Sequence, residues 1–194
     1  SYMEDLGLSN VRKDEIKVDG WEFEKAVLAY ADAAGERQEV QLGAYQTDFV
    51  TKGAETFQVV YVGKGGEKDY ADKDVTGKIV LAEINQRDEW WINFPVYQAH
   101  EKGAKALIAV QIGGYGQVDE KALNAQDIAG PPEAAAFSMS FEDSEKLKAC
   151  LDEKGEITVT LDASSRVMRD VSTYNILGEI PGRRSDRMIL LSAH

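Results

Sequence analysis

Cysteine and histidine are scarce in this chain. Its 194 residues include one cysteine, Cys150, and two histidines, His100 and His194. A lone cysteine excludes a disulfide within the chain, and these three residues do not make a persuasive metal site by themselves. No apolar run approaches the roughly 20 residues that a membrane-spanning helix needs, and no secretion signal is visible. The chain opens at Ser1 without a methionine, so we expect the natural amino terminus to lie upstream.

Positive charge is also in short supply. The sequence has 22 basic and 34 acidic residues, for a net charge of −12 that is spread along the chain. This balance disfavours nucleic acid and anionic membranes as partners. Hydrophobic residues make up 43% and charged residues 29%, which predicts a packed core rather than disorder. The length fits one ordinary domain, or one domain with fragments of a second.

The clearest pattern lies in the middle of the chain. Residues 78–84 form a near-continuous apolar run, which is typical of a strand that is covered on both faces. Residues 94–102 indicate a helix, with Pro95 in its first turn and Gly103 just after its last. Residues 106–111 indicate a second buried strand. The order predicts a strand–helix–strand unit with parallel strands.

Further elements are expected on both sides of this unit. Strands are predicted at residues 39–42, 57–62 and 157–161, and a short extended segment at 134–137. Ser140 is expected to cap a helix that runs to about Leu151, with Asp143 reaching back to it. Residues 21–34 are ambiguous, because their alanine, glutamate and leucine content suits a helix while 26–30 also read as a strand.

The end of the chain changes in character. Residues 164–172 are polar and indicate a linker, whereas 174–180 and 187–192 are each predicted to be strands joined by a turn. The sequence stops at His194, two residues after an apolar strand. A native domain rarely ends there without a cap or tail, so we interpret this end as a cut.

The stretch from residue 74 to 111 resembles the protease-associated domain family. It reads DVTGKIVLAEI, then a loop, then FPVYQAHEKGAKALIAVQ, with the family's Gly-Ala pair at Gly103 and Ala104. The later segment 132–139, the helix after it and the strand 157–161 match the second half of that domain. The resemblance covers about residues 40–165. It departs in the loop 85–91, where many members carry an Arg-Gly pair.

The flanks resemble a different fold family. The sequence YNILGEIPG, a turn and then MILLSAH is similar to the start of the catalytic domain of di-zinc aminopeptidases of the aminopeptidase Y and glutamate carboxypeptidase type. Residues 6–24 resemble the segment just before the inserted domain. The resemblance implies a flanking peptidase segment at 1–20, a protease-associated domain at 21–170 and a truncated start of the catalytic domain at 171–194.

The resemblance also implies chemistry that the chain does not complete. His194 corresponds to the first zinc ligand of the intact enzyme, whose two zinc ions would need further carboxylates and imidazoles beyond this residue. The 194-residue chain is therefore expected to hold no catalytic residues, to bind no cofactor and to be inert. Its partners would be the peptide or protein substrate and the rest of the catalytic domain.

The expected fold class is α/β: a protease-associated fold with a mixed β core, as a distorted barrel or sandwich, that carries the strand–helix–strand unit and two or three packed helices. Segments 11–18, 174–180 and 187–192 are expected to pair as a remnant of the peptidase sheet. The implied role is a non-catalytic domain that shapes substrate access or docks a partner, outside the cell or in its envelope. A stand-alone interaction or sorting module and an insert of a subtilisin-like protease are the alternatives.

Two groups of residues are candidates for binding. Trp90 and Trp91 lie in the loop before the helix, and adjacent residues of an extended segment point to opposite sides, so one of them is expected to be exposed for substrate or partner contact. Asp69, Asp72 and Asp74 offer oxygen ligands that suit calcium, but the EF-hand spacing is absent and a solvated loop is favoured.

Overall fold

The computed structural model describes residues 1–87, 92–114, 119–123, 131, 133–184 and 186–193. The chain divides into two compact units, which we treat separately. Unit 1 joins residues 1–20 to residues 169–194, and unit 2 comprises residues 21–168. Two strands run through both of them, because β1 and β9 each cross the boundary.

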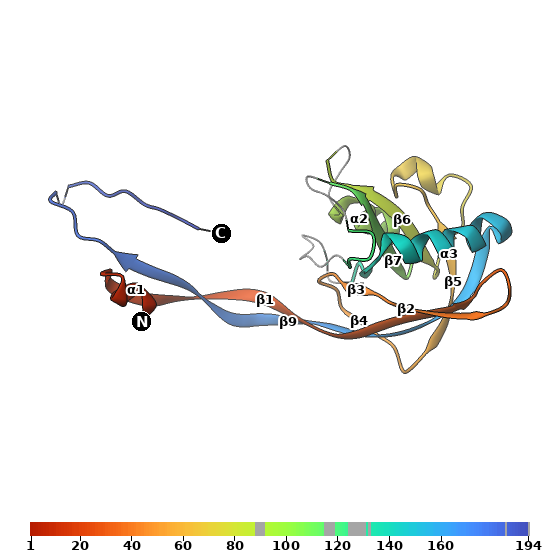
Figure 1. The fold of residues 1–194 in the computed structure, drawn as a ribbon, viewed down its shortest axis with the longest axis horizontal. Coiled ribbons are helices and arrows are strands. Elements are labelled where there is room, and N and C mark those ends of the chain that lie inside the picture. Colours follow the sequence, from red (N-terminus) through yellow and green to blue (C-terminus); the bar gives the residue numbers. More distant parts are fainter. Residues whose placement is uncertain (88–91, 115–118, 124–130, 132, 185, 194) are drawn as a thin grey trace. The chain divides into compact units, whose positions relative to one another are not determined.

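One mixed sheet holds all the strands among the described residues. Its order is β2-β1-β9-β5-β6-β7-β8-β3, with β4 beside β9 (Figure 1). Only Leu42 separates β2 from β3, which occupy opposite ends of this order, so the sheet curls back on itself. The strands are β1 (Ser9–Ala31), β2 (Arg37–Gln41), β3 (Gly43–Ala44), β4 (Phe49–Val50), β5 (Glu55–Tyr61), β6 (Ile79–Asn85), β7 (Ala106–Gly113), β8 (Ala136–Met139) and β9 (Glu156–Glu179).

In the described part of the chain, three α-helices accompany the sheet: α1 (Tyr2–Asp5), α2 (Asn93–Glu101) and α3 (Phe141–Lys154), with a short 3-10 helix, η1 (Glu67–Tyr70). The predicted cap of α3 is confirmed, because the backbone N–H of Asp143 donates to Ser140 Oγ at 3.2 Å. The helix ends at Gly155, whose φ of 78° suits a residue without a side chain. The predicted strand–helix–strand unit is also confirmed, as β6, α2 and β7 with β6 parallel to β7.

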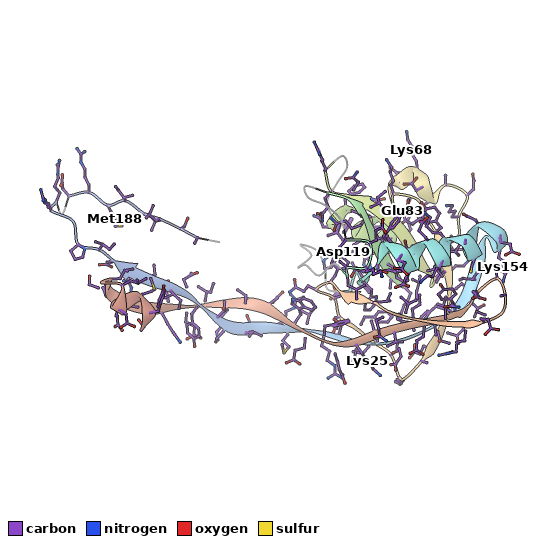
Figure 2. All side chains as sticks on the ribbon, in the orientation of Figure 1. Lys25, Lys68, Glu83, Asp119, Lys154 and Met188 are labelled. Atoms are coloured by element: carbon purple, nitrogen blue, oxygen red, sulfur yellow. The ribbon has the colours of Figure 1, made fainter. Side chains whose placement is uncertain are left out.

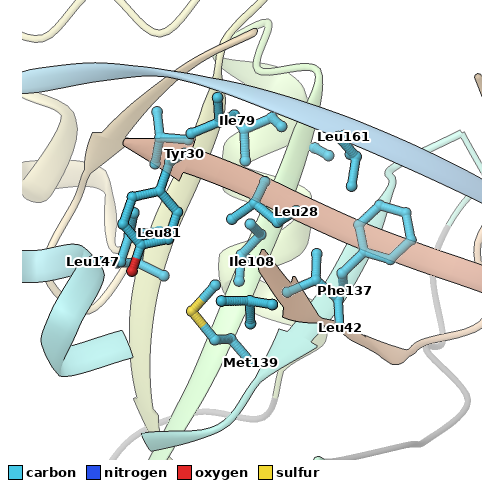
Figure 3. Packing of buried hydrophobic residues seen from close by; sticks show 14 of the residues in the cluster. Leu28, Tyr30, Leu42, Ile79, Leu81, Ile108, Phe137, Met139, Leu147 and Leu161 are labelled. Carbon is cyan, nitrogen blue, oxygen red and sulfur yellow. The ribbon is translucent and has the colours of Figure 1, made fainter. Parts of the chain in front are cut away.

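The apolar run of β6 is buried on both faces, as its lack of alternation predicts. On one face Ile79 and Leu81 join a cluster that includes Leu147 of α3 (Figure 3). On the other face Val80 and Ala82 pack in a second cluster with the inner side of α2. Both helices therefore cover the parallel part of the sheet, one from each side.

Side-chain hydroxyl groups complete the backbone pairing where the strands are short. Thr47 is fully buried, and its Oγ1 accepts a hydrogen bond from the N–H of Ala136 at 3.3 Å. Its carbonyl accepts one from Ser165 Oγ at 2.8 Å. Nearby, the N–H of Ala163 donates to Thr51 Oγ1 at 2.8 Å. Buried backbone groups need such partners, so these hydroxyl groups hold the irregular segment around β4 in place.

Unit 1 is a two-stranded ribbon with a short helix. Arg12 Nη1 lies 3.0 Å from Glu179 Oε1, and Lys17 Nζ lies 2.5 Å from Ser172 Oγ. Residue numbers thus rise along β1 as they fall along β9, so the two strands are antiparallel here. The expected pairing of 11–18 with 174–180 is thus confirmed. Arg169 also pairs with Asp19.

Three sequence predictions are resolved or corrected. The ambiguous segment 21–34 is strand, within β1 and the turn after it. The predicted linker at 164–172 is wrong, because β9 continues through it and pairs with β4 and β1. The predicted strand at 187–192 is also wrong: residues 187–193 have no regular structure, and the run from Met188 to Leu191 is 78–89% exposed. A strand needs a neighbour for its backbone groups, and the sheet offers this segment none.

Candidate functional site

Four parallel strands end along one side of unit 2. β5, β6, β7 and β8 are neighbours in the sheet, and each runs parallel to the next. Their carboxyl ends at Tyr61, Asn85, Gly113 and Met139 define what we call the carboxyl edge. Ligands of proteins with parallel sheets bind outside the carboxyl ends of the strands. This edge is therefore the first place to look for a site.

The end of β7 carries a β-bulge. Ile84 pairs with Gln111 and Asn85 pairs with Gly113, so Ile112 is an extra residue without a partner on β6. Its side chain is 41% exposed. A Cβ atom on Gly113 would lie 2.6 Å from the Asn85 side chain, so only glycine fits without displacing that amide. Bulges re-aim side chains at strand ends, and here the result is an isoleucine presented to solvent.

The helix α2 starts at the same edge and adds exposed rings. Phe94 is 38% and Tyr97 is 48% exposed, while Pro95 on the inner side is buried. The loop after β5 fits closely beneath this helix, because a Cβ on Gly65 would lie 2.8 Å from Pro95 Cβ. Gly65 also has a φ of 71°, which favours glycine on backbone grounds.

A charged network lies where β5, β6 and α3 meet. Glu83 Oε1 accepts a hydrogen bond from Lys148 Nζ at 2.5 Å, and Glu83 Oε2 accepts one from the Tyr61 hydroxyl at 2.7 Å (Figure 2 labels Glu83). Lys148 Nζ also donates a hydrogen bond to Glu145 Oε1 at 2.9 Å and lies 5.6 Å from the centre of the Tyr61 ring. The side chains of Glu83 and Lys148 are 16% and 21% exposed, so this ion pair is largely shielded from water.

The network shifts two pKa values in the same direction. Burial, and then the hydrogen bond to Glu83, raise the pKa of Tyr61 to about 12. The hydrogen bond to Glu83 is the main reason that the pKa of Lys148 rises, with Glu145 adding to it. Both groups therefore keep their protons at neutral pH, and the arrangement stabilises the junction of three elements rather than transferring protons.

The described residues do not supply a metal centre. No three His, Cys, Asp or Glu side chains among them are grouped so that they could hold a metal ion. Two of the candidate calcium ligands serve local turns instead: Asp69 Oδ2 accepts from the N–H of Gly66 at 2.8 Å, and Asp74 Oδ1 from that of Thr76 at 3.1 Å. Asp72 has a φ of 61° in the intervening turn.

The structure does not describe three of the residues that were singled out from the sequence. Trp90, Trp91 and His194 all lie outside the described residues. Sequence reasoning missed the bulge at Ile112, although the glycines that follow it were a signal of irregular backbone. It also missed the pairing of Glu83 with Lys148, for which 65 intervening residues leave no local signal.

Unit 1 presents an unusually apolar surface. Of 17 exposed large hydrophobic side chains among the described residues, 11 belong to this unit. It is also nearly neutral, with 7 of the 22 basic and 8 of the 34 acidic residues, which leaves 15 basic and 26 acidic residues to unit 2. The 11 side chains are Tyr2, Leu6, Ile16, Val18, Tyr174, Ile176, Ile180, Met188, Ile189, Leu190 and Leu191.

No family model and no curated protein matches this sequence. Solved structures do resemble it. An aminopeptidase from Aneurinibacillus sp. strain AM-1 superposes with a TM-score of 0.68 at 21% identity, over 95% of this chain and 42% of that one. BSAP, a zinc aminopeptidase from Bacillus subtilis, gives 0.60 at 21% identity, over 94% and 40%. A peptidase M28 precursor from Shewanella amazonensis SB2B gives 0.64 at 18% identity, over 90% and 42%.

The chain has the fold of part of these peptidases. It spans about two-fifths of the length of each of them. The likeness extends over at least 90% of this chain, so it includes residues of both compact units. Among the described residues, no helix is both long and apolar enough to cross a membrane.

Proposed function

We propose that this chain is a non-catalytic protease-associated domain, with its flanking peptidase segments, of a zinc-dependent exopeptidase of the aminopeptidase Y or glutamate carboxypeptidase type. The observation that carries the proposal is the fold shared across both units with an aminopeptidase and with the zinc aminopeptidase BSAP. In this assignment residues 21–170 are the accessory domain. Residues 1–20 and 171–194 belong to the catalytic domain.

The surface of unit 1 supports that assignment. The segment from Met188 to Leu191 has four consecutive apolar residues that are 78–89% exposed, an apolar surface of the kind that another part of a protein covers. Ile16 and Val18 lie on the face of the ribbon opposite to Glu15 and Lys17, which carry polar contacts to β9. Both apolar sets would be covered by the remainder of a longer peptidase.

The chemistry of the parent enzyme would lie almost wholly outside this chain. His194 is proposed as its first zinc ligand, and two zinc ions, when bound, would supply an activated water for hydrolysis of a terminal peptide bond. The described residues provide no site for these ions. This chain's own contribution is then to shape access for a peptide or protein substrate, with Trp90 and Trp91 as contacts, in an enzyme placed outside the cell or in its envelope.

Peptidase assays on two forms of the protein test this function. The longer protein that continues beyond residue 194 should hydrolyse aminoacyl-p-nitroanilides or carboxy-terminal peptide bonds with zinc, and should lose this activity on chelation. His194→Ala in that protein should abolish activity and reduce bound zinc, measured by atomic absorption. The pure 194-residue chain should stay inert with added zinc. Zinc-dependent hydrolysis by the 194-residue chain, or full zinc content and activity in His194→Ala, would refute the assignment.

A further inference from the structure

Ile112 differs from the other exposed apolar side chains of unit 2. It is the unpaired residue of a β-bulge, it lies at the carboxyl edge of four parallel strands, and it is 41% exposed. Phe94 lies at the same edge, in the first turn of α2, and is 38% exposed. The side chain of Val50 is exposed to a similar degree, but it belongs to β4, which pairs with β9 away from this edge.

The backbone that carries Ile112 is held firmly. The Asn85 side chain occupies the space where a Cβ of Gly113 would lie, and Gln111 Nε2 donates to the carbonyl of Gly113 at 3.3 Å. Asn85 Oδ1 in turn accepts from the N–H of Arg87 at 3.1 Å. Because this backbone is held in place, Ile112 loses little conformational freedom when a ligand packs against it. This favours binding.

Two stretches of sequence at this edge carry no charged residue, while Arg87, Asp88 and Glu89 stand between β6 and α2. The two longest stretches without Asp, Glu, Lys or Arg are residues 90–100 and 106–118, in a chain that carries a net charge of −12. Of these stretches, the described residues 92–100 lead into and form most of α2, and residues 106–113 form β7 with its bulge. A charged ligand would find no opposite charge on either stretch, whereas an apolar segment would lose no ionic hydration by binding there.

We propose that Ile112, together with Phe94, is a contact point for apolar side chains of an extended, uncharged peptide segment. The proposal rests on the proposed function, because the segment would belong to the parent peptidase's substrate. An exposed side chain on a rigid bulge offers a contact surface rather than a cavity. It therefore suits a length of polypeptide better than a small molecule.

A binding titration tests this without any peptidase activity. Two fluorescein-labelled 12-residue peptides, one alternating Leu or Phe with Ser and one of Ser and Gly only, are titrated with the 194-residue chain and followed by anisotropy. The apolar peptide should bind and the Ser-Gly peptide should not. Ile112→Ser and Phe94→Ser should each weaken binding by about fivefold, as expected for losing one partly buried apolar contact. Val50→Ser is the matched control and should bind like wild type.

A second control separates this edge from unit 1. Ile189 is 88% exposed and could attract the same peptide, so Ile189→Ser must also leave the affinity unchanged. The proposal is overturned if neither peptide binds, if Ile112→Ser binds like wild type, or if Val50→Ser or Ile189→Ser weakens binding as much. Circular dichroism checks that each variant is folded. A negative zinc assay on the longer protein would refute the proposed function while leaving this titration intact.

Discussion

At the scale of single residues, two core tyrosines differ in what their hydroxyl groups contact. Tyr30 is 4% exposed and its hydroxyl has no hydrogen-bond partner among the described residues, whereas that of Tyr61 donates to Glu83. A buried hydroxyl without a partner costs about 1–3 kcal/mol. We expect Tyr30→Phe to raise the free energy of unfolding by about 1 kcal/mol and Tyr61→Phe to lower it by about 1 kcal/mol. Urea denaturation measures both, and a destabilised Tyr30→Phe chain would contradict the first.

The same tyrosines predict how stability depends on pH. Burial raises the pKa of Tyr30 to about 12, and that of Tyr61 also rises to about 12. In the unfolded chain the pKa of a tyrosine is about 10, so the folded state holds these protons more tightly. Their contribution is complete below pH of about 10 and is lost as the pH rises towards about 12, with a slope of up to about 1.4 kcal/mol per pH unit for each group.

Urea titrations across that pH window should therefore show a shallower loss of stability for Tyr30→Phe than for wild type. Val50→Ala is the control, since it changes an exposed side chain that carries no titratable group and should leave the slope unchanged. Equal slopes for Tyr30→Phe and wild type would show that Tyr30 does not titrate in this range.

At the scale of elements, local signals predicted most of unit 2. The run at 78–84 and the Ser140 cap each identified an element, because burial on two faces and helix capping leave marks in a few adjacent residues. β9 was divided by a false linker at 164–172. Its outer part has no core face to impose apolar alternation, so the sequence carries no strand pattern there.

The β-bulge that exposes Ile112 could not be predicted from the sequence either. Whether Ile112 is paired or bulged depends on the register of β6 against β7, which is set by contacts across 28 positions of chain. The apolar residues Leu107 and Ile112 look alike in the sequence, although their exposed fractions are 0% and 41%. Periodicity predicts which elements form. It does not predict where a ladder slips by one residue.

The bulge itself makes a prediction at this scale. Gly113→Ala would place a methyl group 2.6 Å from the Asn85 amide, so we expect it to lower the free energy of unfolding by about 1–3 kcal/mol. Asn85→Ala removes the obstacle, so the double variant should be less destabilised than the sum of the two single changes. Gly182→Ala, where the nearest atom would be 3.6 Å away, is the control and should be neutral. Additive effects at positions 85 and 113 would mean that the two side chains do not compete for space.

At the scale of the whole molecule, charge and apolar exposure are divided between the two units. Unit 2 carries a net charge of −11 from its 15 basic and 26 acidic residues, and unit 1 carries −1 from 7 and 8. Exposed large hydrophobic side chains are distributed the other way: of 17 among the described residues, 11 belong to unit 1. A nearly neutral, apolar surface promotes association, and a highly charged one opposes it. Self-association of this chain should therefore proceed through unit 1.

Replacing the run from Met188 to Leu191 (Figure 2) by serines tests that expectation. These side chains are 78–89% exposed, so their removal costs the folded chain no packing. The variant should bind less of the dye ANS and sediment as a smaller species at high concentration, while its urea midpoint stays that of wild type. Val50→Ser with Leu123→Ser, at exposed positions of unit 2, should change dye binding little. A lowered midpoint in the serine variant would instead mean that the segment packs against the folded chain in solution.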